Sequence, residues 1–250
     1  MIPKIIHYCW LSDDPIPDNL KKCILTWHRY MPEYKFIKWD FTIFPMGTSI
    51  WVDQAFEKKK YAFAADYIRL YALYHYGGIY LDSDVEVMKS FNPFLGLDDI
   101  VCYENSSRKG LEVAAIGVSK NRAWVKQCLN HYDGKKFDLG NGLLDTQVMP
   151  EVVKNILNEE KWKLQNVENI NEANRVDSSN TIAVFPHEFF SPKSYETGEI
   201  NMTENTYSVH HFAASWHGSK EKIYKALGKI MGKSNAKRIA NLIKQILIRH

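Results

Sequence analysis

Residues 61–84 constrain the fold of this 250-residue chain more than any other segment. The first sixteen, 61–76, contain four alanines and neither glycine nor proline, which favours a helix. Gly77 and Gly78 end that helix. The next three residues, 79–81, are apolar and match a short buried strand. A helix that turns directly into a buried strand is typical of an α/β domain.

The flanking segments continue the same pattern. Residues 2–10 and 34–39 predict strands, and a helix beginning near Asp18 lies between them. A strand, a helix and a second strand within 40 residues are typical of the start of a parallel sheet. We expect one α/β domain over residues 1–218. Residues 41–60 are expected to be irregular. Further strands are predicted at 100–104, 112–118, 181–185 and 207–212, and further helices at 123–132 and 146–160.

Two carboxylates follow the apolar strand, at Asp82 and Asp84. Residues i and i+2 of an extended segment point the same way, and ligands gather at the carboxyl ends of strands in open α/β sheets. The pair can therefore hold one Mg²⁺ or Mn²⁺. Asp66 and Arg69, three residues apart, share a face of the preceding helix. A lone D-x-D is weak, and an acid–base pair is often a surface ion pair. A helix, a glycine pair that ends it and two carboxylates after the next strand are together a more specific indication of a metal site than either motif alone.

Charge is unevenly distributed along the chain. Residues 219–250 contain nine Lys and Arg and one Glu, a net +8, while the rest contains 23 basic and 28 acidic residues, a net −5. Apolar residues recur in the basic segment at helical spacing, which predicts an amphipathic helical tail. Such a tail either packs on the domain or lies on an anionic membrane. The acidic domain and the lack of a recognised motif argue against nucleic-acid binding.

Cysteine usage and hydropathy favour a cytoplasmic protein. The four cysteines are scattered and form no C-x-x-C pair, which excludes a zinc knuckle. The first residues do not follow the pattern of a signal peptide, and no apolar run is long enough to span a bilayer. We expect free thiols in the cytoplasm, with the chain peripheral on the inner face of the cell membrane if the tail binds lipid.

Three blocks of the chain resemble the DXD-containing glycosyltransferases. That family includes bacterial capsular-polysaccharide transferases and fungal initiating alpha-1,6-mannosyltransferases, and the clostridial glucosylating toxins are similar at greater distance. The resemblance implies a GT-A fold, a Rossmann-like nucleotide-sugar-binding sheet flanked by helices, here with a C-terminal helical appendage. The blocks are residues 61–87, the opening Ile2-Pro3-Lys4-Ile5-Ile6-His7-Tyr8-Cys9-Trp10, and His210-His211-Phe212-Ala213-Ala214-Ser215-Trp216.

The resemblance also implies roles for single residues. Asp84 would bind the metal directly, Asp82 would contact the metal or the ribose, and Asp66 and Arg69 would hold the donor sugar. A third metal ligand would come from His211. Adjacent strand residues point to opposite faces, so only one of the two histidines should face the metal, and His210 is the alternative. The remaining donor-binding positions would be Tyr8, Trp10, Gly78, Tyr80, Ser83, Ser215 and Trp216, although core packing would also account for an aromatic residue such as Trp10.

The implied activity is that of a metal-dependent hexosyltransferase that uses Mn²⁺ or Mg²⁺. It would transfer a sugar from a nucleotide-sugar, a UDP-sugar, to a glycan or lipid-linked acceptor in capsule, exopolysaccharide or lipopolysaccharide biosynthesis. The anomeric configuration of the sugar would be retained. Retention needs either a nucleophilic carboxylate or front-face attack by the acceptor hydroxyl, and we favour front-face attack. Acceptor-side candidates are Glu104, Asn105, Asp145 and Gln147, for which capping or loop polarity is the alternative.

Two other functions remain open from the sequence. A metal-dependent nucleotide-sugar hydrolase or nucleotidyltransferase would use the same carboxylates, and its two-metal forms need a further cluster of acids. We find no such cluster near Asp82. A non-catalytic nucleotide-sugar-binding module would tolerate loss of Asp84, which this chain retains.

Overall fold

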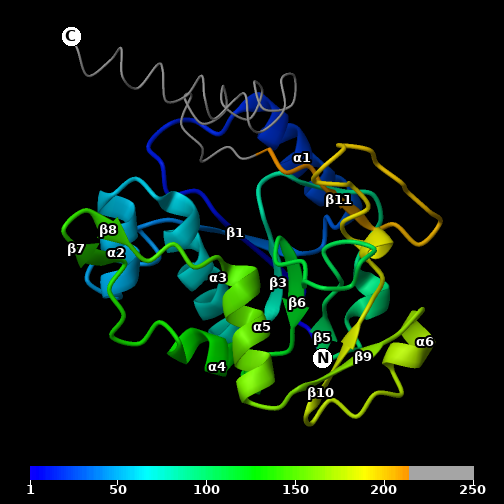
Figure 1. Cartoon of the computed structure of the whole chain (residues 1–250). Helices are drawn as coiled ribbons and strands as arrows, with labels where there is room; N and C mark the ends of the chain where they lie inside the picture. The colour runs from blue at the N-terminus through cyan, green and yellow to red at the C-terminus, as the bar shows by residue number, and fades with distance from the viewer. Residues whose placement is uncertain (214–250) are drawn as a thin grey trace. The chain divides into compact units, whose positions relative to one another are not determined.

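A five-stranded mixed sheet, in the order β2-β1-β3-β6-β5, forms the centre of the fold (Figure 1). The computed structural model describes residues 1–213. Strands β1 (Ile5–Cys9), β2 (Lys35–Trp39) and β3 (Gly78–Leu81) run parallel, and β6 (Ala115–Val118) is antiparallel to both β3 and β5 (Asp99–Ile100). The predicted α/β class is confirmed. The proposed tail, 219–250, lies outside the described residues.

The parallel pair β1 and β2 is connected by α1 (Asp18–Tyr30). The helix buries one apolar face, which contains Leu20, Cys23 and Trp27, and it packs against residues 85–87. The Trp27 indole also donates a hydrogen bond of 2.7 Å to the carbonyl oxygen of Val85, in the strand that follows the two aspartates. The predicted strand–helix–strand unit therefore supports the segment that carries the carboxylates.

Helix α3 (Tyr61–Tyr76) ends at the glycine pair, as predicted. Gly77 has a φ of 63° and Gly78 a φ of 104°, values that residues with side chains rarely adopt. A Cβ on Gly77 would lie 2.7 Å from the amide nitrogen of Lys120, and one on Gly78 would lie 2.7 Å from the carbonyl oxygen of Ile5. The two glycines thus allow the chain to reverse from α3 into β3 at close approach to its neighbours.

Side chains of the sheet alternate between two apolar cores. Tyr80 and Trp39 pack with α3 on one face, whereas Ile6, Ile79 and Leu81 pack toward Trp27 on the other. The strand β3 is buried on both faces, which explains why residues 79–81 form a continuous apolar run in the sequence.

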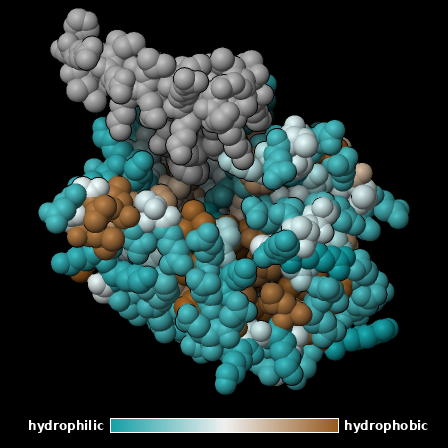
Figure 2. Space-filling model, viewed as in Figure 1, coloured by the Kyte–Doolittle hydropathy of each residue, from teal (hydrophilic) through white to brown (hydrophobic). Residues whose placement is uncertain are grey.

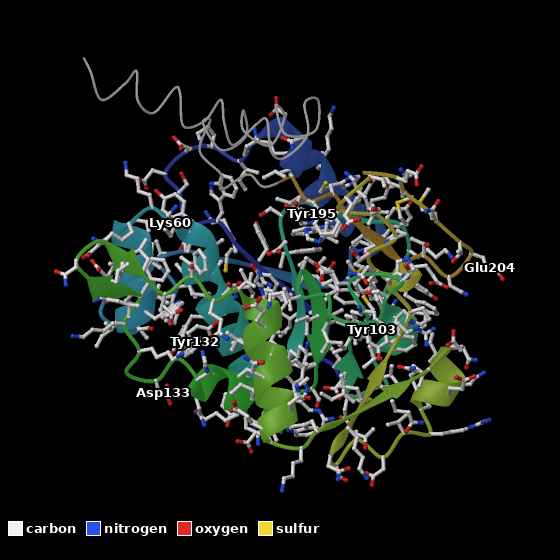
Figure 3. The ribbon with its side chains drawn as sticks, in the orientation of Figure 1. Lys60, Tyr103, Tyr132, Asp133, Tyr195 and Glu204 are labelled. Atoms are coloured by element: carbon white, nitrogen blue, oxygen red, sulfur yellow. The ribbon has the colours of Figure 1, made fainter. Side chains whose placement is uncertain are left out.

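The segment 41–60, expected to be irregular, contains α2 (Ile50–Glu57). The Ser49 side chain caps it by accepting a hydrogen bond of 3.4 Å from the Val52 amide. The Trp51 ring packs 4.8 Å from the ring of Tyr132, which is labelled in Figure 3. This long-range packing stabilises a helix too short to be evident from local propensity.

The sequence analysis missed a hairpin over 138–144 and a strand over 163–166, which pairs with the strand predicted at 181–185. The hairpin joins β7 (Asp138–Gly140) to β8 (Leu143–Leu144), and its apolar residues form part of the brown surface at the left of Figure 2. The strand β9 (Lys163–Asn166) pairs with β10 (Thr181–Val184) in parallel. The remaining elements are β4 (Val85–Val87), η1 (Asn92–Phe94), α4 (Ala123–Asn130), α5 (Met149–Glu159), α6 (Ile170–Ala173), η2 (His187–Phe189) and β11 (Ser208–His210). Among the described residues, no helix combines the length and apolarity needed to cross a bilayer.

Candidate metal centre

Pairing between β4 and β11 brings two distant segments together at the exit of β3. The strands are antiparallel, with His210 opposite Val85. The pairing extends past the strand, where the His211 amide donates a hydrogen bond of 3.1 Å to the carbonyl oxygen of Asp84. The two histidines, more than a hundred residues away in sequence, therefore lie beside the D-x-D segment.

Three side chains converge at this edge of the sheet. Asp82, Asp84 and His210 each offer a ligating atom, and these atoms lie within 4.8 Å of one another. The His210 Nε2 atom is 3.5 Å from Asp84 Oδ1. The side chain of Asp82 is 30% exposed, whereas those of Asp84 and His210 are 12% and 13% exposed. Two carboxylate oxygens and one imidazole nitrogen, open on the Asp82 side, fit a divalent cation such as Mn²⁺.

The structure corrects the preference for His211 over His210. His210 faces the aspartates, while the His211 ring points to Glu86, with 2.8 Å between His211 Nε2 and Glu86 Oε2. Adjacent residues of an extended chain project to opposite sides, and the β4–β11 register determines which one faces the carboxylates. The metal-binding role itself stays a prediction, now for His210.

A buried acid that the sequence analysis missed lies behind His210. Glu112 Oε2 is 3.2 Å from His210 Nδ1, and the Glu112 side chain is only 3% exposed. Burial opposes the charged forms of both residues. Their mutual attraction outweighs it and moves the pKa of Glu112 down to about 2 and that of His210 up to about 9. Glu112 is the only charged residue in the otherwise apolar run 111–118, and this isolated acid could have indicated a site residue from the sequence.

Arg69 connects the helix α3 to the aspartates. Its Nη2 atom lies 2.9 Å from Asp82 Oδ1 and 3.5 Å from Asp66 Oδ1, and its Nη1 atom donates a hydrogen bond of 2.7 Å to the carbonyl oxygen of Val113. The side chain is 5% exposed and lies over the ring of Tyr80, 4.4 Å from its centroid. Asp66, Arg69 and Asp82, predicted as site residues, are brought together.

Burial dominates the ionisation of this triad. It raises the pKa of Asp66 to about 6, and Arg69 only partly offsets that rise. The pKa of Asp82 is also raised by burial. Burial opposes the charged guanidinium of Arg69, but Asp82 and its neighbours outweigh this effect and raise the arginine pKa further. Arg69 pairs with both Asp66 and Asp82, so removing its guanidinium would take that counter-charge from two carboxylates.

Two predicted donor-binding residues are buried. The Tyr80 ring is 1% exposed and lies beneath Arg69, so it supports the arginine from the core side. Gly78 is buried at the start of β3, at the opposite end of the strand from Asp82. Their donor-binding roles stay predictions.

Other predicted donor positions lie near the exit of β1. Tyr8 and Trp10 are partly exposed. The Tyr8 ring packs edge-on against Trp27, and the Trp10 indole donates to the carbonyl oxygen of Asp14. Ser83 Oγ lies 3.5 Å from the carbonyl oxygen of Cys9, at the same edge. Their donor-binding roles stay predictions. Ser215 and Trp216 lie outside the described residues.

The acceptor-side candidates divide into two groups. Asp145 accepts a hydrogen bond from the Gln147 amide, and Asn105 accepts one from the Ser107 amide, so local turns account for them. Glu104 is different: it is half-buried, and burial together with the Glu112 charge raises its pKa. Among the acceptor-side candidates, Glu104 is therefore the one whose pKa is changed by a charged residue of the site.

The two histidines provide a matched test of the metal centre. We expect His210→Ala to weaken Mn²⁺ binding by about tenfold or more, because one of three ligands is lost, and His211→Ala to leave it within about twofold. Titration of Mn²⁺ into each variant, with the free ion followed by electron paramagnetic resonance, measures both dissociation constants. A larger loss in His211→Ala would restore the original preference.

Comparison with known proteins places the two aspartates and Arg69 in a recognised sequence region. Residues 17–102 match the model of a family described as the glycosyltransferase sugar-binding region containing a DXD motif. This range includes α3, both glycines and both aspartates of the motif. The predicted resemblance to DXD-containing glycosyltransferases is thereby confirmed.

Several curated proteins similar to this chain come from fungi. The chain is 32% identical over 144 residues to a mannosyl phosphorylinositol ceramide synthase of Saccharomyces cerevisiae, a match that covers 53% of this chain and 36% of that protein. It is 29% identical over 138 residues to inositol phosphoceramide mannosyltransferase 3 of Schizosaccharomyces pombe, covering 52% of this chain and 37% of that protein. The matched regions thus span little more than a third of these relatives.

A solved structure of the PaToxG glycosyltransferase is also similar. It shares 22% sequence identity with this chain at a TM-score of 0.49, and the match covers 64% of this chain and 70% of that one.

Proposed function

We propose that this chain is a metal-dependent glycosyltransferase that transfers a hexosyl group from a nucleoside-diphosphate sugar to a lipid-linked or glycan acceptor. The observation that carries the proposal is the convergence of Asp82, Asp84 and His210 at the exit of β3, with Arg69 bound to Asp82 from behind. Both aspartates lie inside the matched family region. Carboxylates and an imidazole at the carboxyl end of a strand in an α/β sheet suit a cation that binds a diphosphate.

The arrangement of residues supports departure of a nucleoside diphosphate. A bound Mn²⁺ or Mg²⁺ would supply Lewis-acid neutralisation of the charge that develops on the leaving group. Asp84 and His210 would hold that ion from the buried side, and Asp82 would hold it from the open side. Arg69 keeps Asp82 oriented through a 2.9 Å ion pair and adds positive potential behind the site. The negative charge that develops on the leaving group would thus be stabilised by groups that are already positioned in the folded protein.

The donor and acceptor classes follow from the family and its relatives. A UDP-sugar remains our expected donor, and the mannosyltransferase names of the relatives add a nucleoside-diphosphate mannose as the principal alternative. Those names also suggest an inositol phosphoceramide as a lipid acceptor to test beside a polysaccharide precursor. We expect front-face attack with retention, in which the departing phosphate takes the proton of the acceptor hydroxyl.

Nucleotide release from a panel of donors tests the proposed function. The panel contains UDP-hexoses and nucleoside-diphosphate mannose, each with and without Mn²⁺ and with and without acceptor lipid. We expect one donor to be turned over in a metal-dependent manner, and acceptor to increase the rate. Release of free sugar unaffected by any acceptor would favour the hydrolase alternative, and metal-independent nucleotide binding without turnover would favour a binding module. Proton NMR of the product reports its anomeric configuration.

Membrane attachment at the inner face of the cell membrane is the second part of the proposal. It rests on the net +8 of residues 219–250, because basic segments are attracted to anionic lipid by about 1 kcal/mol per Lys or Arg near the surface. We expect the full chain to float with vesicles of phosphatidylcholine and phosphatidylserine, and a 1–218 truncation to lose most of that binding. Equal flotation of both proteins, or flotation insensitive to salt, would contradict the prediction.

A further inference from the structure

Glu112 is a buried carboxylate with both oxygens engaged. Its Oε1 atom accepts a hydrogen bond of 2.8 Å from the Ala114 amide, and its Oε2 atom lies 3.2 Å from His210 Nδ1. The side chain is 3% exposed. A carboxylate held on one side by the backbone and on the other by an imidazole has a single orientation in the fold.

The contact with Glu112 determines which nitrogen of His210 is available. A carboxylate oxygen accepts only, so Nδ1 must carry the proton in this hydrogen bond. When a cation displaces the proton of Nε2, the lone pair of the imidazole lies on Nε2, the nitrogen that is 3.5 Å from Asp84 Oδ1. The hydrogen bond therefore presents the lone pair of His210 to the candidate cation site and fixes the plane of its ring.

The segment 112–114 also contacts the rest of the site. The Val113 carbonyl oxygen accepts a hydrogen bond of 2.7 Å from Arg69 Nη1. The Ala114 carbonyl oxygen accepts one of 2.8 Å from the Asp82 amide. Residues 112–114 thus each contact one residue of the site, namely His210, Arg69 and Asp82. These contacts connect the histidine on β11 to the aspartate that follows β3.

We infer that Glu112 is a positioning residue, which orients His210 Nε2 toward the cation held by Asp82 and Asp84. The inference rests on the proposed function, since it assumes the cation site. In such carboxylate–histidine–metal arrangements, loss of the outer carboxylate typically weakens metal affinity by about 10- to 100-fold. Glu112 acts through the histidine and does not meet the substrate, because both of its oxygens are committed within the protein.

Mn²⁺ affinity of full-length variants tests the inference directly. We expect Glu112→Ala to weaken Mn²⁺ binding by about 10- to 100-fold. Glu112→Gln, whose amide oxygen still accepts from Nδ1, should recover a large part of that loss. A control is Asp99→Asn, which removes a buried carboxylate 4% exposed and bound to Arg122 at the other end of β6. We expect this control to lower the melting temperature without changing Mn²⁺ affinity.

A double variant separates positioning from a general structural effect. If Glu112 acts through His210, then Glu112→Ala should weaken Mn²⁺ binding no further once His210→Ala is present. Additive losses would overturn the inference, as would wild-type affinity in Glu112→Ala. If the wild-type protein binds no Mn²⁺ at all, the cation site of the proposed function is wrong. A protein that binds Mn²⁺ equally well with and without Glu112 disproves only the present inference.

Discussion

Asp84→Ala is expected to lower metal-dependent nucleotide release by about a thousandfold, because a catalytic metal contributes several kcal/mol of charge stabilisation and each 1.36 kcal/mol is tenfold in rate. Asp84 is the most enclosed carboxylate of the cluster, 12% exposed and 3.5 Å from His210. The Mn²⁺ dependence of the rate should disappear with it. Steady-state release of nucleotide, measured across a Mn²⁺ titration, provides both numbers.

Glu86→Ala is the matched control for Asp84→Ala. Glu86 lies two residues further along β4, is 38% exposed, and contacts His211 instead of the cluster. We expect its removal to leave the rate within about threefold, since a partly exposed ion pair contributes little. Comparable losses in the two variants would show that the acidic surface as a whole, and not a metal centre at Asp84, supports turnover.

Arg69→Ala should produce the largest loss of stability of any single change in the site. The variant removes the counter-charge of two acids, Asp82 at 2.9 Å and Asp66 at 3.5 Å, and the cation over the ring of Tyr80. Breaking a buried ion pair from one side typically costs about 3–5 kcal/mol. We expect urea denaturation at pH 7.5 to show a reduction of this size, together with loss of nucleotide release.

The stability loss in Arg69→Ala should depend on pH. The pKa of Asp66 is raised to about 6 when folded, so the folded state holds a proton that the unfolded state releases near pH 4. Stability therefore falls as the pH rises through this range. Without Arg69 the pKa of Asp66 would rise further. The difference in unfolding free energy between wild type and variant should be larger at pH 8 than at pH 5.

Arg122→Ala separates the stability effect from the function of Arg69. Arg122 forms a comparable buried pair, 2.6 Å from Asp99, far from the aspartates of the motif. We expect it to destabilise the protein while leaving the rate of nucleotide release by the folded fraction unchanged. A pH-independent loss in Arg69→Ala would contradict the pairing with Asp66, and normal nucleotide release would contradict its place in the site.

The local framework of the site could be predicted from the amino-acid sequence. The helix at 61–76, its termination at Gly77 and Gly78, the apolar strand and the emergence of Asp82 and Asp84 were all predicted and match the structure. These features are set by local physics, namely helix propensity, the positive φ that glycine permits, and the two-residue alternation of a strand. The same alternation predicted that only one of the two histidines faces the carboxylates.

The residues that complete the site come from distant segments and could be identified only from the three-dimensional fold. The antiparallel register of β4 and β11 brings His210, and not His211, to Asp84. Glu112 belongs to the site because residues 112–114, directly before β6, contact His210, Arg69 and Asp82. The helix α2 likewise depends on packing of Trp51 against Tyr132. Each depends on which distant segments pair and in what register, and this is set by burial of whole faces and not by neighbours in the chain.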